Sequence, residues 1–102
     1  MATHTIILFL EGELLKIFPV QTHLQSGDTV TFQAQDEVGQ LRFEGGRNPM
    51  EQLKFPMNIT KGMVVTGQVV GVPSETFQLT FGNQSGQKVR AYEPTGTIVI
   101  DD

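Results

Sequence analysis

Hydrophobic and polar residues alternate along several short stretches of this chain. In residues 76–81, Phe77, Leu79 and Phe81 alternate with polar side chains. An alternation with a period of two predicts a β-strand that buries one face. The same pattern recurs, in shorter form, in residues 29–34, 40–43, 88–91 and 97–100.

Turn-forming residues separate these stretches at short intervals. Such residues fall at 11–12, 26–28, 36–39, 82–86 and 94–96. A layout of parallel strands would need a helical segment between each pair of strands, and the pattern shows none at these places. The chain is therefore predicted to form an all-β sandwich or barrel of about seven to eight strands.

Two segments are apolar without alternation. Residues 6–10 are apolar at every position, which predicts a strand covered on both faces within the domain, or one with a face covered by a partner chain. We prefer the first interpretation. Residues 64–72 are interrupted by Gly67 and Gly71, which predicts a bent or bulged strand, and Pro19 predicts an edge or a bulge at its own position.

Residues 44–62 are irregular and contain the one predicted helix. Asn48 suits the N-cap, Pro49 suits the first helical position, and Glu51 can return the capping bond. These signals predict a short helix near residues 49–54. Long connections in compact β domains often carry function, so the candidate site is placed in this irregular segment.

Composition narrows the possible functions. The 102 residues are 38% hydrophobic and 18% charged, which is typical of one soluble domain, predicted here to span residues 1–102. Seven scattered basic residues and a net charge of −4 argue against a nucleic-acid partner. No apolar run is long enough to predict a membrane span.

The sequence offers no recognisable catalytic or metal-binding constellation. It has no cysteine, its three serines lie in turn contexts, and it lacks the Gly-x-Ser-x-Gly motif. We therefore predict no enzyme, no cofactor and no metal. One alternative stays open, because removal of Met1 would leave residues 2–4 with an amine, two amides and the His4 imidazole, a set suited to Cu(II) or Ni(II).

The candidate partner-binding residues are Arg47, Met50, Phe55 and Met57. Arg47 follows two glycines and could hold a small anion, while the methionines and Phe55 either plug an open end of the sandwich or stay exposed as a partner-binding patch. The predicted function is a non-catalytic binding or assembly module with a protein partner or self-association. The alternative is a small-ligand or glycan-binding sandwich, which is less favoured because Tyr92 is the only tyrosine and there is no tryptophan.

Two segments resemble the cupredoxins. Residues 27–32, Gly-Asp-Thr-Val-Thr-Phe, are similar to an early strand of that family, and residues 75–81 with 96–100 are similar to its last two strands. The resemblance implies a Greek-key β sandwich, and an immunoglobulin-like sandwich is the alternative. A blue-copper centre needs Cys, two His and usually an axial ligand, but residues 81–95 contain no Cys, His or Met. The resemblance thus implies the fold without the copper site and without inherited electron transfer.

Overall fold

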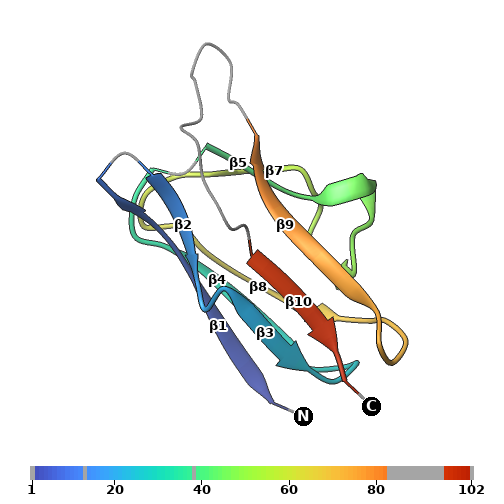
Figure 1. Cartoon of the computed structure of the whole chain (residues 1–102). Coiled ribbons are helices and arrows are strands. Elements are labelled where there is room, and N and C mark those ends of the chain that lie inside the picture. Colours follow the sequence, from blue (N-terminus) through green and yellow to red (C-terminus); the bar gives the residue numbers. More distant parts are fainter. Residues whose placement is uncertain (1, 13, 38, 83–95, 102) are drawn as a thin grey trace.

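The computed structural model describes residues 2–12, 14–37, 39–82 and 96–101. Two five-stranded sheets pack face to face in a sandwich (Figure 1). Sheet A has the strand order β2-β1-β4-β8-β6, and sheet B has the order β3-β10-β9-β5-β7. The strands are β1 (Thr3–Glu11), β2 (Leu14–Phe18), β3 (Gln21–Leu24), β4 (Thr29–Ala34), β5 (Gly39–Phe43), β6 (Met50–Glu51), β7 (Met57–Ile59), β8 (Val64–Val69), β9 (Thr76–Gly82) and β10 (Gly96–Ile100).

The chain crosses between the two sheets at Pro19. β2 lies at the edge of sheet A and β3, which follows directly, lies at the edge of sheet B. β3 pairs in parallel with β10, and β1 pairs in parallel with β4, whereas the other pairs are antiparallel. Pro19 therefore sits between two edge strands, as its missing amide hydrogen predicted.

The core lies between the sheets and is built by the predicted alternation. Phe77, Leu79 and Phe81 of β9 are buried, and Val30, Phe32 and Ala34 of β4 face them from the other sheet. The predicted strands at 29–34, 40–43, 76–81 and 97–100 are present in β4, β5, β9 and β10. The predicted strand at 88–91 lies outside the described residues.

More strands are described than the seven to eight predicted. Ten appear because the segment around Pro19 divides between two sheets, and because β6 and β7 are edge strands of only two and three residues. Such short strands leave no alternation to recognise in the sequence.

The predicted helix at residues 49–54 is wrong. Met50 and Glu51 instead form β6, which pairs with Val69 and Gln68 of β8. The Asn48 side chain accepts a hydrogen bond from the Met50 amide at 2.9 Å and donates one to the Leu53 carbonyl at 2.8 Å. A helix of one or two turns is marginal, so the sheet pairing and the burial of Met50 prevail. A 3-10 turn at Glu44–Gly46 precedes this segment.

Gly67 serves a different purpose from the predicted bulge. β8 pairs with β4 in unbroken register from Gln68 opposite Thr29 to Val64 opposite Gln33. A Cβ at Gly67 would lie 2.7 Å from the Glu51 carbonyl oxygen. The glycine therefore lets the backbone at Glu51 approach β8 closely. Close approach of another backbone is, besides a bulge, a common reason for glycine in a strand.

Replacing Thr22 with valine should stabilise the protein. Thr22 is buried on β3, and among the described residues its hydroxyl oxygen has no hydrogen-bond partner. Because burying an unpaired hydroxyl is unfavourable, Thr22→Val should raise the free energy of unfolding by about 1 kcal/mol, measured by urea denaturation. The control is Thr31→Val, because the Thr31 hydroxyl lies 2.9 Å from that of Thr66 and so has a hydrogen-bond partner. Its removal should not raise the free energy of unfolding. A less stable Thr22→Val protein would contradict this prediction.

Candidate binding surfaces

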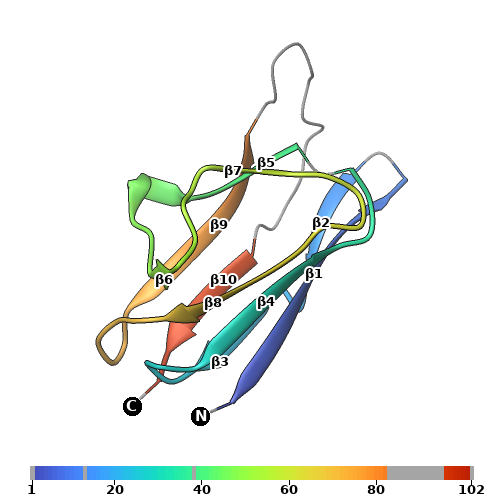
Figure 2. The same cartoon turned by 180° about the vertical axis from the view of Figure 1, so that it is seen from behind.

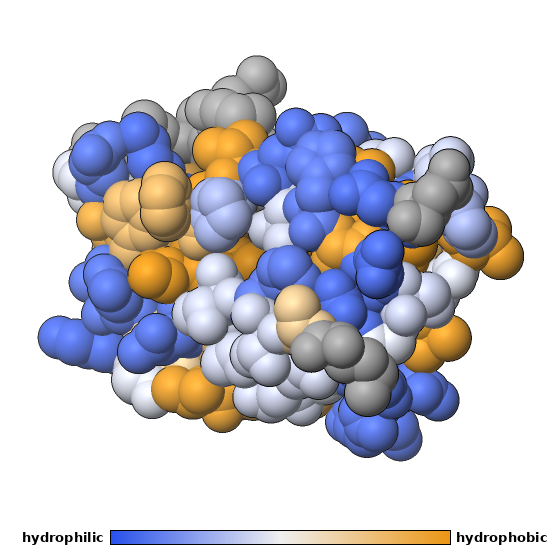
Figure 3. Space-filling model, turned by 90° about the horizontal axis from the view of Figure 1, so that it is seen from below, coloured by the Kyte–Doolittle hydropathy of each residue, from blue (hydrophilic) through white to orange (hydrophobic). Residues whose placement is uncertain are grey.

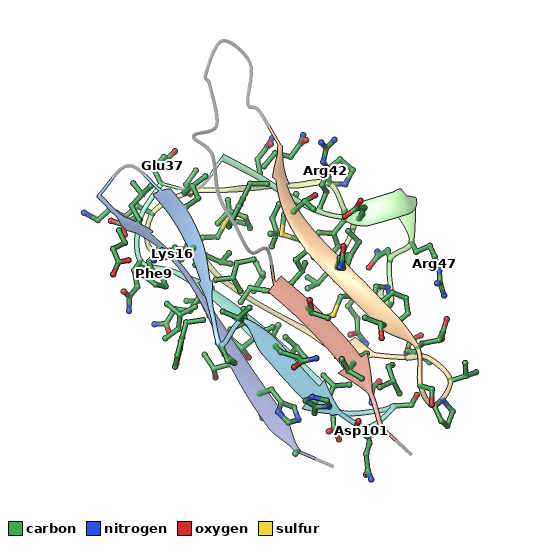
Figure 4. The ribbon with its side chains drawn as sticks, viewed as in Figure 1. Phe9, Lys16, Glu37, Arg42, Arg47 and Asp101 are labelled. Atoms are coloured by element: carbon green, nitrogen blue, oxygen red, sulfur yellow. The ribbon has the colours of Figure 1, made fainter. Side chains whose placement is uncertain are left out.

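A cleft opens beside the end of β5, where the irregular segment leaves sheet B. The β5–β7 pairing ends at Leu41 opposite Met57, so the two strands diverge beyond this point. The cavity between them has a volume of about 460 Å³. Its lining residues are Arg42, Phe43, Glu44, Gly45, Arg47, Asn48, Phe55, Pro56 and Thr80. Arg42 and Arg47 lie on the same side of the molecule (Figure 4).

The structure brings two of the four predicted site residues to this cleft. Arg47 is exposed and Phe55 is half-buried, and both line it. Met50 is instead buried, with 4% of its surface exposed, and Met57 is half-buried against the core. Met63 is also half-buried there. The apolar residues of this segment thus pack largely inward, which was the first of the two predicted alternatives.

Sequence reasoning missed Arg42 and Thr80. They lie on β5 and β9 and face each other across the pairing of these strands. Each occupies an ordinary outward position in an alternating strand, so no local signal marks it. Only the pairing of two strands that are distant in sequence shows that these residues share a surface.

The cleft has a fixed aromatic wall. The Phe55 ring contacts the Phe43 ring edge-on, with centroids 4.8 Å apart, and lies 6.1 Å from the Phe32 ring. Phe43 and Phe32 are buried in the core. The two hydrogen bonds of the Asn48 side chain, to the Met50 amide and the Leu53 carbonyl, hold the backbone before Phe55 in place. Such contacts fix the orientation of a ring before anything binds to it.

Arg47 is already engaged by neighbouring groups. Its guanidinium group donates a hydrogen bond to the Glu75 carboxylate and lies over the Phe77 ring, 4.8 Å from the centroid. The Val72 amide and, after it, the Arg47 side chain hold the pKa of Glu75 below its ordinary value. The Arg47 side chain is therefore held by Glu75 and Phe77, whereas Arg42 forms no ion pair with any described residue.

The outer face of sheet A is a second candidate surface. We define it by the described outward residues of β2, β1, β4 and β8, which the strand registers place together: Lys16, Phe18, Thr3, Thr5, Ile7, Phe9, Glu11, Thr29, Thr31, Gln33, Val64, Thr66 and Gln68. Phe18 is 61% exposed and Val64 is 57% exposed, while Ile7 and Phe9 are half-buried. Viewed from behind, β1 and β4 have no described segment lying over them (Figure 2).

The preferred interpretation of residues 6–10 is therefore wrong. Ile6 and Leu8 are buried between the sheets, but Ile7 and Phe9 point to the outer face, which no third layer of described residues covers. The other interpretation, a face for a partner chain, stays a prediction.

Two histidine–aspartate pairs lie at the end of the sandwich near Ala2 and Asp101. The His4 Nε2 lies 3.0 Å from Asp28, and the His23 Nδ1 lies 3.1 Å from Asp101. Both pairs line a depression of about 390 Å³. No serine is among its lining residues in the described part of the chain, and no three metal-ligating side chains there could hold an ion together. Seen from this end, hydrophilic residues divide the hydrophobic ones into separate groups (Figure 3).

Asp28 is the most strongly held carboxylate at this end. It accepts hydrogen bonds from the Ala2 and Gln25 amides, each at 3.0 Å, besides its contact with His4. The two amides and then the His4 side chain lower the pKa of Asp28 from 3.8 to about 2. The Ala2 nitrogen and the His4 ring, proposed above as copper ligands, are thus used to hold Asp28.

Comparisons with known proteins identify the fold. No protein-family model and no curated protein matches the chain. The crystal structure of the Blue Copper Oxidase from Nitrosomonas europaea is similar, with a TM-score of 0.59 and 11% identity over 98% of this chain and 38% of that one. Lac15 from a marine microbial metagenome is also similar, with a TM-score of 0.50 and 12% identity over 95% of this chain and 31% of that one.

These similarities show the fold alone, because sequence identity is low. They confirm the expected cupredoxin-like β sandwich. The chain spans about a third of the length of both similar proteins. Among the described residues, no helix is long and apolar enough to cross a membrane.

Proposed function

We propose that this chain is a non-catalytic assembly module that binds a second copy of itself through the outer face of sheet A. The supporting observation is a difference between the two sheets. Among the described side chains, the outer face of sheet A carries four large apolar ones, from Ile7, Phe9, Phe18 and Val64. On the described outer face of sheet B, Val99 is the only one. A patch of this kind is a feature of surfaces that bind other proteins.

The strand register brings these four side chains to one region of the face. Phe18 lies directly opposite Ile7, and Phe9 lies two residues further along β1 on the same face. Val64 extends the same row beyond Gln33. A second sheet could pack on this row as the two sheets of a sandwich pack on each other, with side chains interdigitating.

The charge distribution favours a second copy as the partner. The described charged residues on this face are Lys16 and Glu11, and their side chains pair with each other. The chain carries a net charge of −4, but no other described carboxylate is among the residues that define this face. Two copies can therefore meet face to face without placing unpaired carboxylates against each other, an arrangement that interface cores avoid.

The size of the face sets the expected affinity. Four strands about 4.8 Å apart and a few residues long give a surface on the order of 500 Å² per copy, or about 1,000 Å² in total. This total is at the lower limit for specific interfaces, so we expect a reversible dimer of micromolar or weaker affinity. In both similar structures the matching fold is part of a longer chain, which supports a unit that packs beside further protein.

Sedimentation velocity over a range of protein concentrations tests the proposal. We expect a monomer–dimer equilibrium that shifts toward dimer as salt is raised, because salt screens the repulsion between two chains of net charge −4. Val64→Asp should abolish the dimer by placing a charge on the exposed face. Val99→Asp, the matched change on sheet B, should leave dimerisation intact.

Urea denaturation of each variant verifies that it folds. A protein that stays monomeric at all concentrations would overturn the proposal. Loss of the dimer in folded Val99→Asp but not in Val64→Asp would also overturn it.

A further inference from the structure

We propose that the cleft beside β5 binds a small ligand with one carboxylate on a flat apolar body. Arg42 would hold the carboxylate, and Phe55 with Pro56 would contact the apolar body. The site is separate from the outer face of sheet A, because Arg42 lies on β5 of sheet B, and Figure 4 shows it well apart from Phe9 and Lys16. This inference is independent of the proposed self-association.

Arg42 is the positively charged lining residue that remains available to a ligand. It is exposed and faces Thr80 across the strand pair, so a hydroxyl group lies next to its guanidinium-bearing side chain. It has no ion-pair partner among the described residues. A guanidinium group presents parallel N–H donors that match the two oxygens of a carboxylate.

The aromatic wall suits a flat apolar group. The edge-on contact with Phe43 at 4.8 Å fixes the Phe55 ring, and the half-buried side chain leaves part of the ring open to the cleft. A cavity of about 460 Å³ falls within the range of small-molecule sites, and it exceeds what a single ring with a short acidic arm requires.

The lining charges favour a ligand with a single negative charge. The charged residues that line the cleft are Arg42, Arg47 and Glu44, and Arg47 is already bonded to Glu75. A second negative charge on the ligand would therefore be repelled by Glu44. No second unpaired cation among the described lining residues would offset this repulsion. This arrangement favours a monocarboxylate over a phosphate or a dicarboxylate.

Titration of the ¹⁵N-labelled protein with phenylacetate, followed by NMR, tests the inference. Phenylacetate should shift the amides of residues 42–48 and 55 and leave those of β1 and β2 unchanged. Arg42→Gln should weaken binding by about tenfold, because the charge-assisted bonds are lost. Glu44→Gln should strengthen binding by about twofold to threefold, because it removes the opposing charge. Lys54→Gln, an exposed cation outside the lining, is the matched control and should have little effect.

Phenylacetamide, the neutral analogue of similar shape, should bind at least tenfold more weakly than phenylacetate if the carboxylate is recognised. Equal binding of both compounds, or unchanged binding by folded Arg42→Gln, would overturn the inference. Absence of any cleft shift with phenylacetate would overturn it as well. A peptide ending in phenylalanine with a free carboxylate distinguishes the source of the group, since tighter binding of the peptide than of phenylacetate assigns the carboxylate to a protein terminus.

Discussion

Replacing Phe32 with alanine should lower the free energy of unfolding by about 3–5 kcal/mol. The side chain is 1% exposed at the centre of β4, and its ring lies 6.1 Å from that of Phe55. The substitution removes apolar contacts and leaves a cavity that the two sheets cannot fully close. Because a domain of this size is stable by only about 5–15 kcal/mol, a large part of its stability would be lost. Urea denaturation at neutral pH measures the change.

Phe18→Ala is the matched control for this substitution. Phe18 is also a phenylalanine of sheet A, but it lies on the edge strand β2 and is 61% exposed. Its truncation should therefore change the free energy of unfolding of the monomer by less than about 0.5 kcal/mol. Measurements at low protein concentration keep self-association out of the comparison. Similar losses in both variants would contradict the assignment of Phe32 to the core and Phe18 to the surface.

Replacing Asp28 with asparagine should have the second-largest effect, a loss of about 2–3 kcal/mol at neutral pH. The buried carboxylate accepts bonds from the Ala2 and Gln25 amides and contacts His4, and these contacts join β1 to the turn before β4. An asparagine side chain offers one acceptor oxygen in place of two and brings an NH₂ group against the donors. Urea denaturation measures the loss.

The contribution of Asp28 should also depend on pH. Its pKa is lowered from 3.8 to about 2 in the folded protein, so between these values the unfolded chain binds a proton that the folded chain does not. The stabilisation, about 2 kcal/mol, is therefore complete above about pH 5 and is lost as the pH falls toward 2. The wild-type protein should lose more stability between pH 6 and pH 3 than Asp28→Asn does. Parallel pH profiles of the two proteins would contradict this prediction.

The two-layer arrangement of the fold could be predicted from the sequence. Alternation in residues 29–34 and 76–81 located two central strands and their buried faces. It could not locate β6, because two residues have no period, and the capping signals at Asn48 and Pro49 are equally compatible with a tight turn. The role of Gly67 was also inaccessible, since the approaching Glu51 carbonyl belongs to that same unrecognised segment.

The candidate sites were less predictable than the fold. Composition marked the segment that contains Arg47 and Phe55, and both line the cleft. The same argument included Met50, which is buried, because an apolar residue in an irregular segment gives no sign of which way it points. Arg42 was missed, since its position in the cleft depends on the divergence of β5 and β7, a property of three-dimensional pairing.

The crossing of the chain at Pro19 has a consequence for folding kinetics. Among the described strands, β3 is hydrogen-bonded to β10 alone, and a contact in this region joins residues 78 positions apart, His23 and Asp101. Closing a loop of that length loses chain entropy before any contact compensates for it. During synthesis, β3 must therefore wait for β10 to leave the ribosome, so sheet B should be completed late and folding should be slow for a chain of this size.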